Sequence, residues 1–188
     1  MFSSIEAILW QSIVGFSQKA ELEKARGNIQ LPKDRYTPTV FLSHKHSELK
    51  YIQSIIGLLR EQFHAEVYID SEDQDMPKIT NAVTARRIKH KIRKCQKFVF
   101  VATKDSLESP WCNWEIGWSD RCKAYRNMLI FPFDIGNSRK FNGNEYLRMY
   151  PYVQKDGERY FVIDPNNKLD DAVPLEKWLD PMYGIIHR

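Results

Sequence analysis

The sequence predicts an α/β domain built on a central parallel sheet of about five strands, with helices on both faces. Two observations predict this class. Short segments that are apolar on both faces, as buried parallel strands are, recur along the chain. Longer segments with apolar residues three and four positions apart, as in amphipathic helices, alternate with them. This alternation favours a sheet that is covered on both sides.

Size and composition narrow the possible classes further. The chain has 188 residues, which suits one such domain with an appendage, and its net charge of +4 permits nucleic-acid binding without requiring it. The three cysteines, Cys95, Cys112 and Cys122, have no C-x-x-C spacing. We therefore predict neither a disulfide framework nor a structural zinc site, and we expect a cytoplasmic protein.

Residues 1–30 are predicted to form an N-terminal helical extension. An apolar stripe runs along it at helical spacing, and the pattern ends at Gly27-Asn28. Glu6 lies early in the segment, with no basic residue before the apolar run and no cleavage site after it, so neither a signal peptide nor a membrane span is expected. A linker follows, and residues 36–188 form the predicted α/β domain.

The first half of this domain contains two predicted strands and two helices. Residues 39–43 (TVFLS) are a buried strand, and residues 47–63 are a helix for which Ser47 is the expected N-cap. A second strand at 65–70 leads into an acidic loop at 71–77. The helix at 79–95 has one apolar stripe and many cations on its other faces.

The second half continues the alternation. We predict strands at 97–103, 127–134 and 157–164, and helices at 110–126 and 174–180. Open sheets of this kind bind ligands outside the carboxyl ends of their strands. The segments SHKHSE, DSEDQD and TKDSLESPW are expected at that edge, because each follows one of the first three strands.

Several ligand classes lack their usual signature at this edge. The first loop contains no G-x-G-x-x-G for a dinucleotide cofactor and no P-loop glycines, and the chain has no G-x-S-x-G. His44 and His46 provide two imidazoles without a third ligand, so no metal site is predicted. The cations at residues 78–97 are not interleaved with aromatic residues, and nucleic acid is therefore not an expected partner.

The segment SPWCNWEIGWSD at residues 109–120 is the most unusual part of the sequence. Ser109 and Pro110 are typical of a helix start, which places Glu115 in the second turn, near the positive end of the helix dipole. Trp111 and Trp118 lie one turn away on either side, and no cation is a helical neighbour of Glu115. Such a carboxylate can be partly desolvated, as catalytic acids often are. The alternative is an ordinary boundary residue beside a core stripe.

These segments together resemble a TIR domain, over roughly residues 36–165. PTVFLSHKHSE is similar to the first-strand box of that family, and VYIDSEDQDMP to the second strand and its loop, with Pro77 near the family's loop proline. FVFVATKDSLESPWCNWEIGWS contains the S-x-W-C-x-x-E box, which is the most specific match. The loop box departs from the family pattern, because Lys78 replaces the usual glycine.

The resemblance implies a flavodoxin-like TIR fold and one of two functions. Some TIR domains are non-catalytic adaptors, and others cleave NAD at the nicotinamide–ribose bond with the glutamate of W-x-x-x-E, here Trp111 to Glu115. The stand-alone form is similar to bacterial TIR proteins of the Thoeris antiphage defence system. Those make a cyclic ADP-ribose isomer that activates a separate effector protein. A deoxyribosyltransferase-like enzyme on a related fold is a further alternative.

The resemblance also implies site residues and partners. Glu115 is the expected catalytic residue, and the expected substrate contacts are Ser43, His44, Asp70, Ser106 and Trp111. The four polar contacts have a competing interpretation as turn or capping residues. NAD is the expected substrate, with no cofactor and no metal. The expected protein partners are the effector, coupled through a diffusible product, and further copies of this chain, bound through TIR surfaces or the N-terminal helix. No membrane partner is expected.

Overall fold

The computed structural model describes residues 37–73, 81–133, 144–166 and 172–183. The predicted N-terminal helix at residues 1–30 and the loop proline Pro77 lie outside these ranges. Within the described ranges, no helix has both the length and the apolar composition needed to cross a bilayer.

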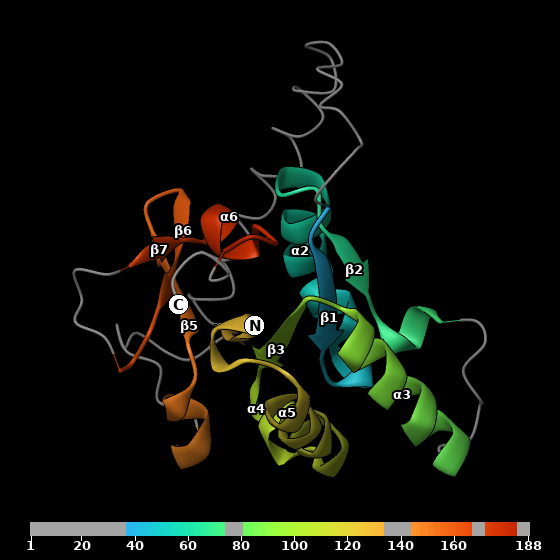
Figure 1. The fold of residues 1–188 in the computed structure, drawn as a ribbon. Coiled ribbons are helices and arrows are strands. Elements are labelled where there is room, and N and C mark those ends of the chain that lie inside the picture. Colours follow the sequence, from blue (N-terminus) through green and yellow to red (C-terminus); the bar gives the residue numbers. More distant parts are fainter. Residues whose placement is uncertain (1–36, 74–80, 134–143, 167–171, 184–188) are drawn as a thin grey trace.

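The described strands form one sheet with the order β2-β1-β3-β4-β5-β6-β7 (Figure 1). Neighbours from β2 to β5 are parallel, and β5, β6 and β7 are antiparallel. The predicted class is confirmed, and the sheet has two strands more than expected, β5 and β7. The bounds are β1 (Thr39–Ser43), β2 (Glu66–Tyr68), β3 (Lys97–Ala102), β4 (Met128–Pro132), β5 (Tyr152–Asp156), β6 (Arg159–Ile163) and β7 (Val173–Pro174).

Helices cover both faces of the sheet, as expected (Figure 1). The side chains of β3 alternate: Val99 and Val101 face a core shared with α2 (Leu49–Gly57) and α6 (Leu175–Leu179). Phe98 and Phe100 face a second core, shared with α3 (Ala82–Lys94) and α5 (Pro110–Cys122). All six residues of β3 are buried, as expected for a strand covered on both faces.

The helix ends follow the capping residues, with one exception. Ser109 caps α5 and Pro110 occupies its first turn, as predicted. Asn81 caps α3 and shares a capping box with Thr84. The prediction that Ser47 caps a helix at 47–63 is wrong. Ser47 lies inside a 3-10 turn (His46–Glu48), which is closed by a 2.8 Å bond from Glu48 N–H to the Lys45 carbonyl, and a cap residue must be extended instead.

Three further elements differ from the sequence prediction. The helix α2 ends in a π turn (Leu58–Gln62), and a short helix α4 (Lys104–Glu108) precedes α5. The segment predicted as a fifth strand is β6, which pairs with β5 through a hairpin turn at Gly157. This glycine has a φ of +56°, a conformation that glycine adopts at low cost.

Candidate active site

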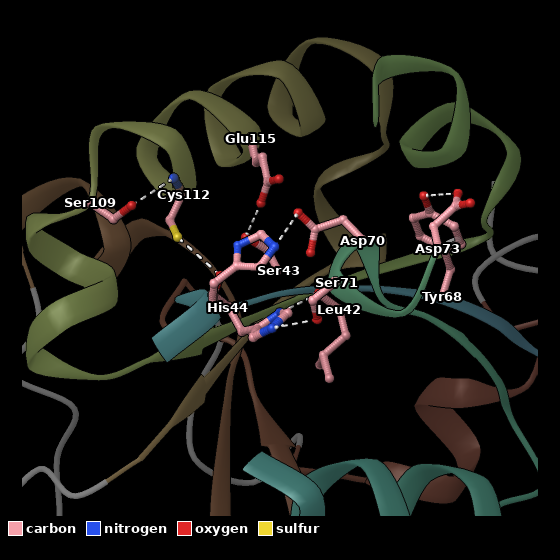
Figure 2. Close-up of polar contacts among 11 residues, drawn as sticks. Leu42, Ser43, His44, Tyr68, Asp70, Ser71, Asp73, Ser109, Cys112 and Glu115 are labelled. Atoms are coloured by element: carbon pink, nitrogen blue, oxygen red, sulfur yellow. Dashed lines mark hydrogen bonds and ion pairs between the residues drawn. The ribbon is translucent and has the colours of Figure 1, made fainter. Parts of the chain in front are cut away.

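The carboxyl ends of β1 and β2 and the start of α5 come together at one edge of the sheet (Figure 2). Ser43 is the last residue of β1, Asp70 begins a 3-10 turn (Asp70–Glu72) after β2, and Glu115 lies in α5. All three residues are buried. The parallel order of the strands produces this meeting, since it places the loop after β1 beside the loop after β2.

Glu115 accepts hydrogen bonds from Ser43 and from the Trp111 indole. The Ser43 hydroxyl donates to Glu115 Oε2 over 2.5 Å, although the two residues are 72 positions apart in the sequence. Glu115 is 2% exposed, and no lysine or arginine in the described part of the chain forms an ion pair with it. The carboxyl group is therefore buried without a compensating positive charge.

This environment changes the acidity of Glu115. Burial raises the pKa of Glu115, and the nearby Asp70 carboxylate raises it further, to about 8. Hydrogen bonds from the Ser43 hydroxyl and the Trp111 indole act in the opposite direction. An acid with a pKa close to physiological pH is typical of catalytic groups, because small changes in its surroundings switch its charge.

His44 and Cys112 tie the surrounding segments together. His44 Nδ1 is 3.5 Å from the Leu42 carbonyl oxygen, and its Nε2 is 3.3 Å from the Ser71 hydroxyl, so the ring bridges the loops after β1 and β2. The Cys112 thiol donates to the His44 carbonyl over 3.4 Å, which fixes the first turn of α5 to the same loop. Burial lowers the pKa of His44, so the ring is neutral at physiological pH.

His46 lies at the open side of this cluster. Its Nε2 is 3.7 Å from Asp70 Oδ2, and its side chain is 60% exposed, whereas that of Asp70 is 10% exposed. The rings of His44 and His46 are 5.6 Å apart between centroids. No group of three His, Cys, Asp or Glu side chains among the described residues is arranged as a metal site. The two histidines therefore differ in role: one is a buried bridge and the other faces solvent.

Comparison with known sequences identifies the family. Residues 40–159 match the family model of the TIR domain. This chain belongs to the TIR domain family. Over 120 residues it is 31% identical to the probable 3' cyclic ADP-D-ribose synthase ThsB' of Bacillus cereus (strain MSX-D12), a match covering 62% of this chain and 60% of that protein. The chain thus spans about 60% of the length of the curated relative that it matches.

Two solved structures have a distant likeness to this TIR domain. The CMP N-glycosidase BcmB of Clostridium botulinum has a TM-score of 0.43 and 18% identity, covering 64% of this chain and 90% of that chain. A prokaryotic SEFIR domain has a TM-score of 0.42 and 13% identity, covering 57% of this chain and 81% of that chain. Both are too distant to inform the function of this TIR domain.

Of the six residues expected at the TIR site, five lie close together in one cluster. Ser43, Glu115 and Trp111 are linked through hydrogen bonding, and Asp70 influences Glu115 through its charge. His44 joins the cluster through its ring contact with the Leu42 carbonyl and through its own carbonyl, which accepts from Cys112. Ser106 is not part of it. This residue is fully buried, and its hydroxyl donates to the Val101 carbonyl over 2.8 Å and completes the capping box of α4, which is the capping role left open by the sequence.

The tryptophans of α5 divide into two roles. Trp111 is half-buried next to Glu115, and its ring stacks on that of Trp114 with centroids 4.8 Å apart. Trp114 and Trp118 lie under the Lys89 ammonium of α3, whose Nζ is 5.5 Å and 4.4 Å from the two ring centroids. These two rings pack α5 against α3, whereas the Trp111 indole hydrogen-bonds to the Glu115 carboxylate.

A groove of the molecule lies away from this site. A groove of about 510 Å³ begins at Pro38, before β1, whereas Ser43 lies at the opposite end of that strand. Its lining includes the carboxylates of Glu176 and Asp180. Two acids disfavour a ligand that carries phosphates. The groove is therefore a poor site for a nucleotide.

Proposed function

We propose that this TIR domain cleaves NAD at the nicotinamide–ribose bond and closes the remaining ADP-ribose into a cyclic isomer. The proposal rests on the buried Glu115 carboxyl. It accepts a hydrogen bond from Ser43, and no lysine or arginine in the described part of the chain forms an ion pair with it. The similarity to a protein named as a 3' cyclic ADP-D-ribose synthase supports it.

The properties of Glu115 suit this reaction. Nicotinamide leaves as a neutral molecule and needs no general acid, while the ribose passes through a state that resembles an oxocarbenium ion. A carboxylate beside the ribose stabilises that positive charge, and more strongly in a buried site than in water. The positive nicotinamide ring of NAD lowers the pKa of a carboxyl placed next to it, so substrate binding itself favours the charged form of Glu115.

Surrounding residues supply binding and exclusion of water. The half-buried Trp111 offers an aromatic wall to the ring systems of NAD. Closure requires that a group of the same ADP-ribose reach the cationic ribose before water does. The relative is named for a 3' cyclic product. We propose that closure in this TIR domain likewise forms a bond to a ribose oxygen. The product is proposed to act as a second messenger for a separate effector in antiphage defence.

The proposed location is the cytoplasm. All three cysteines lie within the described ranges as free thiols, and Cys95 and Cys112 are buried. Free thiols are typical of reducing compartments. NAD and the proposed effector would be available there without transport of the product across a membrane.

Product analysis tests the proposal and separates it from its alternatives. The purified protein is incubated with NAD, and nicotinamide and the remaining nucleotide are identified by mass. We expect nicotinamide and a species with the mass of ADP-ribose less one water. A deoxyribosyltransferase-like enzyme would instead yield a new base–sugar product when other bases are added. An adaptor would yield no product under any condition, including crowding or assembly, and this result would overturn the proposal.

The acidity of Glu115 predicts a pH dependence. We expect kcat/KM for NAD to rise with pH and level off above about 8, because only the ionised carboxylate stabilises the ribose cation. The variant Asp70→Asn removes a charge that raises the pKa of Glu115, so its profile should shift to lower pH. The variant Ser43→Ala removes a hydrogen bond that lowers this pKa, so its profile should shift to higher pH. Each shift is expected to be about one pH unit.

The midpoints of the three profiles are compared, and not the absolute rates. Loss of substrate contacts changes the height of a profile, whereas the position of the rising limb reports the ionising group. If the three midpoints coincide, Glu115 is not the group that controls the pH dependence.

A further inference from the structure

We propose that His46 is the base that accepts the proton of the attacking ribose hydroxyl in the closure step. This inference rests on the proposed function and assigns a residue to its second half, after nicotinamide has left. The sequence singled out His46 only as half of a possible metal pair. In the structure it is the solvent-facing member of the cluster that contains Glu115.

Closure differs from cleavage in its need for a base. In cleavage, the bond between ribose C1 and the nicotinamide nitrogen breaks, and nicotinamide keeps the electron pair, so no proton moves. In closure, a ribose hydroxyl oxygen forms a bond to C1 and must lose its hydrogen. The balanced step is one C–O bond formed, one O–H bond broken and one proton transferred to a nearby base.

Two other groups of the cluster, Glu115 and His44, are poorly suited to accept this proton. Glu115 must remain an anion beside the cationic ribose, and its Oε2 already accepts the Ser43 hydrogen bond. His44 is 4% exposed, and both of its ring nitrogens face partners, the Leu42 carbonyl and the Ser71 hydroxyl. A substrate hydroxyl therefore has no free nitrogen of His44 to approach.

His46 has the features that the step requires. Its side chain is 60% exposed, so a bound substrate can reach the ring. Its Nε2 faces Asp70 Oδ2 at 3.7 Å, which favours the tautomer with hydrogen on Nε2 and leaves Nδ1 as the accepting atom. When the ring takes up the proton, the Asp70 carboxylate stabilises the imidazolium that forms. The 3.7 Å separation is an ion-pair distance and is longer than a hydrogen bond, and such contacts often tighten when substrate binds.

The test measures how much cyclic product forms for each nicotinamide released. Wild type, His46→Ala and His46→Gln are incubated with NAD, and cyclic and linear ADP-ribose are quantified together with nicotinamide. We expect the ratio of cyclic product to nicotinamide to fall at least about 100-fold in both variants, the lower end of what a general base contributes. Linear ADP-ribose should rise in compensation, because water then captures the ribose cation.

The glutamine variant and a matched histidine make the test specific. Glutamine keeps a polar side chain near Asp70 but cannot take up a proton, so a wild-type ratio in His46→Gln would overturn the assignment. His90 is exposed on α3 and is not among the residues described at the cluster, so His90→Ala should keep the wild-type ratio. A fall of the ratio in this variant as well would also overturn the assignment, because the effect would not be specific to His46.

Two outcomes distinguish this inference from the proposed function. If wild type releases nicotinamide but makes only linear ADP-ribose, cleavage stands and the role of His46 in closure is overturned. If either His46 variant releases no nicotinamide, His46 serves cleavage, and the assignment to closure is again overturned. Absence of nicotinamide from wild type under all conditions would remove the proposed function itself.

Discussion

Replacing Glu115 with glutamine is expected to lower nicotinamide release from NAD by about 10³-fold, the loss typical of removing a group that stabilises transition-state charge. Glutamine has nearly the same shape, and its carbonyl can still accept the hydrogen bond that Ser43 donates to Glu115 Oε2. The variant therefore removes the negative charge with little change of packing. Initial rates of nicotinamide release for both proteins at pH 8 give the measurement.

The same substitution is expected to stabilise the protein. The pKa of Glu115 is about 8 in the folded state against an ordinary 4.5, so the folded protein binds more protons than the unfolded chain between these values. The free energy of unfolding of wild type therefore falls as pH rises from about 4.5 to about 8. Glu115→Gln avoids this penalty, and we expect a gain of about 1–3 kcal/mol at pH 8 and almost none at pH 4.

Thermal unfolding of both proteins at several pH values checks this second effect. Glu61 is an exposed glutamate on the π turn after α2, and Glu61→Gln is a suitable control that should change neither stability nor release. A glutamine variant of Glu115 that keeps wild-type turnover would remove Glu115 from the catalytic role. Loss of both activity and stability would indicate a structural residue instead.

Truncating Trp178 to alanine is expected to cost about 3–5 kcal/mol of the free energy of unfolding, the usual range for a buried tryptophan. Trp178 is 1% exposed in α6, and its indole N–H donates to the Arg126 carbonyl over 2.8 Å. The buried Lys97 ammonium lies 4.8 Å from the ring centroid and also donates to Asn127 Oδ1 over 2.9 Å. Alanine would leave a cavity and remove the aromatic face from this lysine.

The measurement is urea or thermal unfolding, with Trp178→Phe as the matched variant. Phenylalanine keeps a ring under Lys97 but lacks the N–H, so we expect a smaller loss of about 1–2 kcal/mol. If the alanine variant lies within about 1 kcal/mol of wild type, α6 is not part of the cooperative core, since core truncations of this size cost more. The result therefore also tests whether the predicted domain extends as far as α6.

Much of the fold could be predicted because its signals are local. The strands of the parallel core are short apolar runs, and α3 and α5 have both an apolar stripe and a capping residue. β5 was missed because its segment, YVQKD, is largely polar and buries mainly Val153. A hairpin signal was present in the Asp156-Gly157 pair, between β5 and β6. The edge strand β7 has only two residues, which is too short for a periodic pattern.

The sequence predicts which residues belong to the candidate site, but not which of them contact one another. The meeting of Ser43 and Glu115 depends on the order of strands and not on any local pattern, because 72 positions separate them. Ser106 follows a strand, as Asp70 does, yet its hydroxyl is directed back into the α4 capping box. The proposed role of His46 depends on its distance to Asp70, which only the structure provides. The sequence places His44 and His46 two residues apart in one loop and does not indicate which of them is buried.

The two outermost strands of the described sheet are also its shortest. β2 has three residues and β7 has two, and β7 ends at Pro174, which has no N–H to donate. Long flat edges invite pairing with strands of other molecules and lead to aggregation, whereas short edges offer few unpaired groups. The short edges of the described sheet therefore disfavour edge-to-edge pairing between copies of this TIR domain.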